Sequence, residues 1–370
     1  MRILTIDVGT GTQDILLFDS EQQLENCVKM VMPSPTLVVS QQIRALTETG
    51  TPLLLDGVTM GGGPSHWAAM DHLRAGHPVY ATPDAARTFD DDLDGVAKMG
   101  ITVVSEDEAA GLRGVERVTL RDLWVDAVQT SLRAFGANDH FDALAVAVFD
   151  HGAAPPGYSD RTFRFEYLAE QVRQSADLTV FSFLKDAIPA GLTRLQAVAA
   201  SLDAAYPLLV MDTAPAAVLG ALEDPAVSSQ PDAIVANVGN FHCLAFRLES
   251  GRIAGLFEHH TGELTQDELE TFLDKLIAGT ITNQEVFDDM GHGALMFQPP
   301  GALADPFLAI TGPRRGLLSG SRLRPYLAVP HGDMMLAGCF GLLRAYAAHD
   351  AGVAAAVESQ MGPRPAFAVR

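Results

Sequence analysis

Cysteine is scarce in this sequence of 370 residues, which contains Cys27, Cys243 and Cys339 and no others. The three residues are far apart and form no CxxC pair, so the pattern excludes the usual zinc frameworks and iron–sulfur motifs. A small, odd set of this kind is typical of reduced thiols in a protein core. We therefore expect neither a redox activity nor one that depends on an iron–sulfur cluster.

Basic residues are also few, with 25 Lys and Arg against 46 Asp and Glu and a net charge of −21. This balance argues against binding to nucleic acid or to an anionic membrane. No run of about 18 apolar residues is present, and the N-terminal residues lack the order of a signal peptide. We expect a cytoplasmic protein with no nucleic-acid or membrane partner, in which local N–H groups, a few arginines or a metal ion hold any phosphate.

The remaining composition is that of an ordinary globular protein, with 48% apolar and 19% charged residues. Residues 144–149 form a continuous apolar run, as in a buried parallel strand, and residues 265–278 have the apolar spacing of an amphipathic helix. Segments of these two kinds alternate along the chain, which predicts an α/β fold. The length is sufficient for two domains, and we expect the tail after Gly352 to be loosely ordered.

Two segments that begin 230 positions apart resemble one another, residues 6–20 and residues 236–250. Each consists of an apolar strand, a turn of glycine and small polar residues, and a second apolar strand. Such a β-hairpin presents N–H groups and hydroxyls to an anion without a bulky side chain in the way. We predict two related domains that hold a phosphate chain from both sides, with these candidate residues: Gly9, Thr10, Gly11, Thr12, Gly239, Asn240 and His242.

Two aspartates stand at the ends of predicted strands. Asp7 precedes the first glycine turn, where its carboxylate could orient a hydrated Mg²⁺ beside a phosphate, or else cap the turn. Asp212 lies where a strand passes into an alanine-rich helix, and it could orient an attacking water or substrate hydroxyl, or else cap that helix.

A glycine-rich loop at residues 61–66 follows a predicted strand and precedes a helix, which makes it an anion site in principle. It lacks the Lys-Ser/Thr pair of a P-loop. Gly62, Gly63 and His66, together with His151, are candidates for a substrate pocket, and the alternative is a tight structural turn.

The remaining histidines considered are weaker candidates for site residues. His259 and His260 would point to opposite faces of a strand and could not both bind one metal, while His292 and His331 are interpreted as ordinary loop histidines.

Five segments, taken in their order along the chain, resemble those of the actin-like ATPase superfamily, which includes actin, sugar kinases and heat-shock chaperone ATPases. The resemblance makes the two hairpins the phosphate-1 and phosphate-2 loops and places Asp212 in the first connecting segment. It assigns residues 311–313, with Gly312 and Pro313, to the adenosine motif and residues 333–341 to the second connecting helix. It implies duplicated ribonuclease H-like domains that bind ATP and Mg²⁺.

More narrowly, the chain resembles a family labelled "putative pyruvate formate-lyase activating enzyme", through residues 7–14, 237–240 and 257–262. Glycyl-radical activation would require a CxxxCxxC motif, which the three isolated cysteines do not supply. The second hairpin also departs from the superfamily pattern. Asn237 replaces an aspartate and brings no charge to a metal, Phe241 stands where the first hairpin has Gly11, and His242 replaces a threonine.

The expectation is therefore two actin-like domains with nucleotide between them. The first would comprise residues 1–220 and 331–370, with an insert at about 50–160, and the second residues 221–330. The function expected is ATP binding with kinase-like phosphotransfer or ATP hydrolysis. In this scheme Asp212 is the base, Asp7 and Asn237 are near Mg²⁺, and the insert binds a small molecule or protein partner. The alternatives are a non-catalytic nucleotide sensor or ATP-gated partner protein, and a scaffold that binds no nucleotide.

Overall fold

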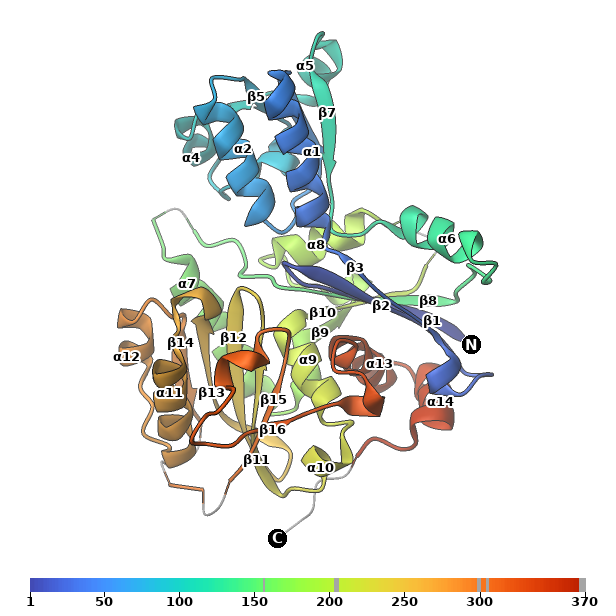
Figure 1. Ribbon diagram of the computed structural model, residues 1–370, viewed down its shortest axis with the longest axis vertical. Coiled ribbons are helices and arrows are strands. Elements are labelled where there is room, and N and C mark those ends of the chain that lie inside the picture. Colours follow the sequence, from blue (N-terminus) through green and yellow to red (C-terminus); the bar gives the residue numbers. More distant parts are fainter. Residues whose placement is uncertain (156, 203–205, 298–300, 304–305, 366–370) are drawn as a thin grey trace.

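A computed structural model describes residues 1–155, 157–202, 206–297, 301–303 and 306–365. Strands and helices alternate along the chain, which confirms the predicted α/β class (Figure 1). None of the helices in these residues is long and apolar enough to cross a membrane. The tail expected to be loosely ordered instead contains a helix, because Asp350 caps it and Val353 and Val357 are buried.

The helices surround three sheets. The α-helices are α1 (Pro35–Thr49), α2 (Pro64–Arg74), α3 (Pro83–Ala86), α4 (Leu93–Lys98), α5 (Glu106–Gly111), α6 (Val125–Ala134), α7 (Asp160–Gln174), α8 (Thr193–Ala200), α9 (Thr213–Ala221), α10 (Pro225–Ser228), α11 (Gln266–Ala278), α12 (Asn283–Asp288), α13 (Ala337–His349) and α14 (Ala351–Met361). Short 3-10 helices are η1 (Leu24–Asn26), η2 (Leu178–Phe181), η3 (Lys185–Ala187), η4 (Thr261–Glu263), η5 (Arg315–Leu318) and η6 (Pro330–Gly332).

The first sheet contains the N-terminal hairpin and has the strand order β3-β2-β1-β8-β10-β9. Its strands are β1 (Arg2–Val8), β2 (Thr12–Asp19), β3 (Val28–Pro33), β8 (Ala143–Val148), β9 (Ser182–Leu184) and β10 (Leu208–Asp212). The pairs β1–β2 and β2–β3 are antiparallel, whereas β1–β8 and β8–β10 are parallel. The central parallel strand β8 is apolar throughout because both faces of the sheet are covered.

The second sheet contains the other hairpin and has the order β14-β13-β12-β11-β15-β16. Its strands are β11 (Asp232–Val238), β12 (His242–Glu249), β13 (Arg252–His260), β14 (Gly293–Met296), β15 (Phe307–Thr311) and β16 (Tyr326–Leu327). From β13 to β16, the directions of its strands repeat those from β3 to β10 of the first sheet. The similarity of the two hairpins in sequence therefore corresponds to equivalent positions among five strands, while the sixth strand, β9 or β14, lies at a different edge of each sheet.

A third sheet of parallel strands lies at the top of Figure 1, in the order β6-β5-β4-β7. Its strands are β4 (Leu53–Gly57), β5 (Val79–Ala81), β6 (Thr102–Val103) and β7 (Glu116–Leu120). This sheet and the helices from α1 to α4 share a hydrophobic core of their own. We call this part of the molecule the upper layer.

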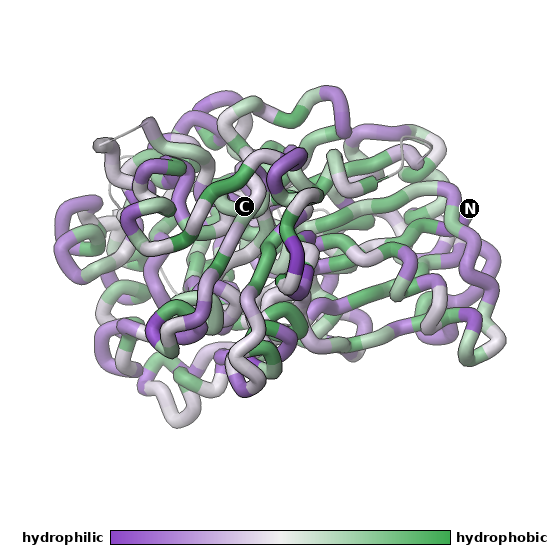
Figure 2. The backbone as a smooth tube through the Cα atoms, turned by 90° about the horizontal axis from the view of Figure 1, so that it is seen from above, coloured by the Kyte–Doolittle hydropathy of each residue, from purple (hydrophilic) through white to green (hydrophobic). Residues whose placement is uncertain are grey.

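Two helices, α9 and α13, pack between the first and second sheets, and their residues share one core with strands of both (Figure 1). Figure 2 shows that apolar residues concentrate in the inner strands, whereas the outer helices and loops are mainly hydrophilic. The helices cross at glycines because there is no space for a side chain. A Cβ at Gly220 would overlap the carbonyl oxygen of Ala337, and one at Gly341 would overlap that of Ala216.

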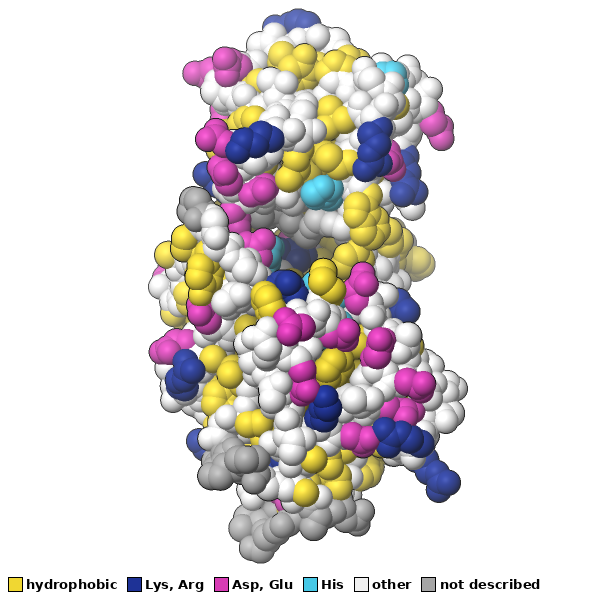
Figure 3. Space-filling model, turned by 90° about the vertical axis from the view of Figure 1, so that its left-hand side faces the viewer, with side chains coloured by type: hydrophobic (Ala, Val, Ile, Leu, Met, Phe, Trp, Pro, Cys, Tyr) yellow, Lys and Arg dark blue, Asp and Glu magenta, His cyan; other side chains and the backbone are white. Residues whose placement is uncertain are grey.

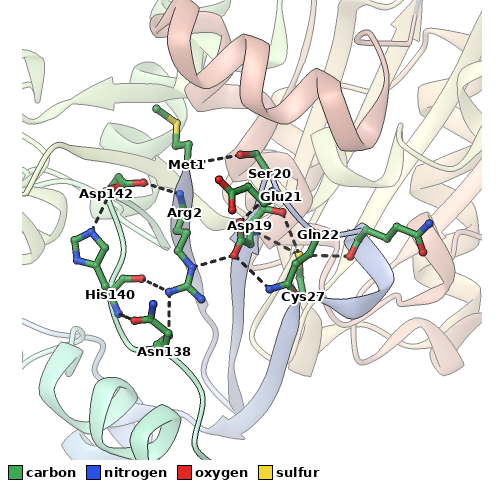
Figure 4. A network of polar contacts seen from close by, with 11 residues as sticks. Met1, Arg2, Asp19, Ser20, Glu21, Gln22, Cys27, Asn138, His140 and Asp142 are labelled. Carbon is green, nitrogen blue, oxygen red and sulfur yellow. Dashed lines mark hydrogen bonds and ion pairs between the residues drawn. The ribbon is translucent and has the colours of Figure 1, made fainter.

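At the end of β1 remote from the turn, polar contacts fix the hairpin to the chain before β8 (Figure 4). The Arg2 guanidinium donates to Asp19 at 3.1 Å and to the carbonyl oxygen of His140 at 3.0 Å. The Arg2 N–H donates to Asp142 at 2.7 Å. These contacts hold the open end of the first hairpin, where β1 begins and β2 ends, against the chain before β8.

A buried arginine joins the first and second sheets. Arg164, on α7, has a fully buried side chain and donates through Nε and Nη2 to both carboxylate oxygens of Glu258 on β13, at 3.0 and 2.9 Å. Its Nη1 atom contacts Asp212 at the end of β10 and the carbonyl oxygen of Asp150. One guanidinium thus holds a carboxylate from each sheet.

We predict that Gly341→Ala destabilises the protein by about 1–3 kcal/mol, because the added methyl forces α9 and α13 apart. Gly111→Ala is the matched control, since Gly111 is helical and a Cβ there would have no neighbour within 4 Å. Urea unfolding measures both variants. Equal stability of the two would show that the helix crossing is not tightly packed.

Replacement of Arg164 by methionine is expected to lower the free energy of unfolding by about 3–5 kcal/mol, because two buried carboxylates lose their cation. Adding Asp212→Asn and Glu258→Gln to this variant removes the unpaired charges and should restore much of the stability. Chemical denaturation compares the single and triple variants. A single variant as stable as the parent would contradict the role given to the arginine.

Candidate functional site

A cavity of about 490 Å³ lies where the hairpin turns of the first and second sheets meet the upper layer. Figure 3 shows the molecule hollowed at this level, with dark blue basic side chains inside the hollow. Most residues predicted as site residues line it: Asp7, Gly9, Thr10, Thr12, Gly62, Gly63, His151, Asn237, Gly239, Asn240, His242 and Pro313. The folded chain thus brings together candidates from five separate parts of the sequence.

The two hairpin turns have the same internal hydrogen bond and face one another. The N–H of Gly9 donates to the carbonyl oxygen of Thr12, and that of Gly239 to the carbonyl oxygen of His242, both at 2.9 Å. A Cβ at Gly11 would lie 2.5 Å from Nδ2 of Asn240, so Gly11 lies directly against the second turn. This close approach accounts for a glycine at the tip of the first turn.

Phe241, at the tip of the second turn, lies toward the upper layer. Its ring centroid is 5.6 Å from that of Trp67 on α2, and a Cβ at Gly63 would be 3.4 Å from its ring. The bulky residue that distinguishes the second turn from the first therefore forms a contact between the second sheet and the upper layer.

Four predicted residues do not line this cavity: Gly11, which lies against the second turn, Asp212, His66 and Gly312. Asp212 is buried, caps α9 by accepting from the N–H of Ala214 at 3.3 Å, and pairs with Arg164. Burial raises its pKa, although Arg164 opposes the shift. His66 packs against Phe89, with ring centroids 5.3 Å apart. Gly312 borders a smaller adjoining cavity of about 40 Å³, next to Asp7, Asp14 and Asn237.

Asp14 is a site residue that the sequence did not single out. The register of β1 and β2 pairs it with Asp7, and both residues line both cavities. Counting outward from the predicted turn would have placed the two aspartates opposite one another. Asp7 accepts from the Thr213 hydroxyl at 2.6 Å, whereas Oδ1 of Asp14 has no hydrogen-bond partner among the described residues.

Both carboxyl groups retain protons more strongly than usual. Burial raises the pKa of Asp7 to about 7, and the charge of Asp212 adds to this effect. Burial also raises the pKa of Asp14 to about 8, with a further contribution from the neighbouring Asp7. Two like charges at a buried position favour a shared proton or a bound cation.

Three histidines meet at another wall of the cavity. His242 begins β12, His260 ends β13 directly opposite it, and His292 precedes β14. His260 and His292 were not predicted as site residues. As expected for neighbours on a strand, His259 faces away from the cavity and packs against Phe272, with ring centroids 5.6 Å apart.

Cationic side chains complete the cavity lining, among them Arg161 and Arg194. Arg194 pairs with Asp122 at 2.7 Å. Arg161 donates to the carbonyl oxygens of Phe287 and Gly291, at 3.0 and 2.8 Å. In the part of the chain that the structure describes, no carboxylate forms an ion pair with Arg161, so its charge is available to an anion despite the acidity of the protein as a whole.

Solved structures similar to this chain include two proteins that match over most of its length. One is ethanolamine utilization protein EutJ from Carboxydothermus hydrogenoformans, with 13% identity, a TM-score of 0.36, and coverage of 92% of this chain and 89% of that chain. The other is an exopolyphosphatase-like protein, with 10% identity, a TM-score of 0.27, and coverage of 98% and 92%. None of the curated proteins compared with the chain matches it.

Among protein families, the model described as "Putative pyruvate format-lyase activating enzyme (DUF1786)" matches residues 60–317. The match confirms the narrower of the two resemblances predicted from the sequence, and it includes the second hairpin, the histidines and much of the upper layer. The chain belongs to this family.

Proposed function

We propose that the protein binds ATP in the cavity between the two hairpin turns and carries out phosphotransfer or ATP hydrolysis there. The observation that carries the proposal is the placement of two equivalent glycine turns face to face, beside a pair of carboxylates. In this proposal residues 1–220 and 331–370 form one actin-like domain, with an insert, and residues 221–330 form the other. Repetition of strand order and direction in the two sheets supports that division.

The phosphates would lie against the two turns. Their N–H groups and the hydroxyls of Thr10 and Thr12 are hydrogen-bond donors of the kind that cradle phosphate, and glycine allows close approach of the backbone. Arg161 would supply positive charge from the wall of the cavity near His292, since it donates to the carbonyl oxygen of Gly291. The insert, through Gly62 and Gly63, would contact the second substrate or partner.

Magnesium would be held between Asp7 and Asp14, largely through water, with the side chain of Asn237 beside them. Carboxylate and amide oxygens are suitable ligands for Mg²⁺, which keeps several waters and also binds phosphate. A cation would stabilise the charged forms of both carboxyl groups and so oppose the burial that raises their pKa. The adenosine would enter the smaller cavity near Gly312 and Pro313, where the flexible Met334 and Met335 would move to make room.

A second candidate, a nucleotide sensor without turnover, is favoured by the environment of Asp212. Arg164 and the N-terminus of α9 occupy its oxygens, so we now propose a positioning role for it rather than that of a base. Radical activation, the chemistry named in the family description, is not supported by the cysteines. All three are buried, and Cys243 lies in a different core from Cys27 and Cys339.

The raised pKa values predict how stability changes with pH. In the unfolded chain both carboxyl groups ionise near pH 4, so without a divalent cation the folded state should lose stability as the pH rises toward 7 and 8. Asp14→Asn should raise the free energy of unfolding by roughly 1–2 kcal/mol at pH 8 and by less at pH 5. Thermal unfolding in EDTA measures the effect, and an equal gain at both pH values would contradict it.

For ATP itself, calorimetric titration is expected to show binding that is strengthened by Mg²⁺. In Asp7→Asn, the gain in ATP affinity that Mg²⁺ produces should fall about tenfold or more, a change of about 1.4 kcal/mol in binding free energy. Asp19→Asn, at the other end of the same hairpin, is the matched control and should retain the Mg²⁺ effect. Release of ADP by the parent and its loss in Asp7→Asn would support an enzyme, whereas binding without turnover would support the sensor. Absence of ATP binding would overturn both.

A further inference from the structure

The histidine cluster of His242, His260 and His292 has the arrangement of a metal-binding site. Each residue offers one ring nitrogen, and these nitrogens lie within 4.8 Å of one another. Bond lengths of about 2.0–2.1 Å around a tetrahedral zinc ion bring ligand nitrogens to about 3.4 Å apart, so small side-chain movements suffice. His242 and His260 face the cavity and are partly exposed, which provides an entry path.

Neighbouring groups set the direction of two of the rings. Nδ1 of His260 lies 2.8 Å from the carbonyl oxygen of Met290, which can only accept, so this nitrogen donates and the neutral ring keeps the lone pair on Nε2. Nδ1 of His292 is buried without a hydrogen-bond partner in the described residues, and lies 3.7 Å from the Glu258 carboxylate. In zinc sites, one ring nitrogen of a ligand histidine binds the metal and the other usually faces a carboxylate, as Nδ1 of His292 faces Glu258.

The electrostatic environment of His242 and His292 disfavours their charged forms. Burial lowers the pKa of His242 and of His292, and the neighbouring histidines and Arg164 add to the effect. Metal binding requires neutral imidazole, so the lowered pKa of these two rings favours it. Glu258 and Asp212 lie beside Arg164 and offset its charge at the cluster.

We infer that His242, His260 and His292 bind one transition-metal dication of the zinc type, with the remaining coordination position open to the cavity. Three imidazole ligands and an open position are the donor set of a catalytic rather than a structural zinc site. Nitrogen ligands do not suit Mg²⁺, so this site is distinct from the carboxylate pair and does not depend on the proposed ATP function. Because His242 belongs to the second hairpin turn, an oxyanion on the metal would lie in the same cavity as any bound phosphate.

Calorimetric titration of the chelator-treated full-length protein with Zn²⁺, without nucleotide, tests the inference. We expect one ion per chain, no competition from millimolar Mg²⁺, and at least about 100-fold weaker binding in His260→Ala and in His292→Ala. Loss of a group that only hydrogen-bonds a metal ligand weakens binding by up to about 100-fold, so loss of a ligand itself should cost at least as much. Co²⁺ provides a second readout, a visible absorption spectrum of tetrahedral nitrogen coordination that each variant should lose.

His151→Ala is the matched control, because His151 lines the same cavity outside the cluster and its removal should leave Zn²⁺ affinity within about threefold. Circular dichroism checks that each variant is folded, and His260→Ala, at a partly exposed position, keeps the test valid if the buried His292 variant unfolds. The inference is overturned if Zn²⁺ does not bind, if binding survives His260→Ala, or if inorganic phosphate alone binds the cluster without metal.

Discussion

The buried Arg164 guanidinium is the interaction on which the arrangement of the site depends. It contacts carboxylates that belong to different sheets, and it lies 4.5 Å from the ring of Phe149, a cavity residue. Because desolvation offsets much of the attraction in such a cluster, its main contribution is geometric. The first and second sheets can meet in only one relative position if both carboxylates are to reach the same cation, and that position sets the separation of the two hairpin turns.

The sequence was sufficient to predict the α/β class and the two hairpins, because apolar periodicity and glycine turns are local signals. Most of the site residues that it predicted line the cavity, since many of them stand at the ends of recognisable strands. The environment of Asp212 was not predictable, because Arg164 is 48 residues away in the sequence and reaches Asp212 only through the tertiary packing of α7. Counting residues outward from the first turn could have identified Asp14 as the partner of Asp7. No such argument identifies His292, because no local pattern marks it.

The cavity combines two unlike chemical environments in one space. At the first hairpin, two carboxyl groups share a buried position and hold protons unusually firmly. At the second, the three histidines and the charge of Arg161 face the same space. A ligand with a polar anionic portion and bound cations would satisfy both walls at once, whereas an uncharged ligand would leave the carboxyl pair and the arginine uncompensated.

The irregularity in the pairing of β12 with β13 has a consequence of its own. Opposite Arg247 and Leu248 the register shifts by one, so that Ala254 is an additional residue in β13. If β12 and β13 paired without this shift, His259 rather than His260 would stand opposite His242. The composition of the histidine wall is thus decided by strand register as well as by residue identity. Loss of this irregularity at an unchanged chain length, remote from the cavity, would exchange the inward and outward histidines while every ligand remained in the sequence.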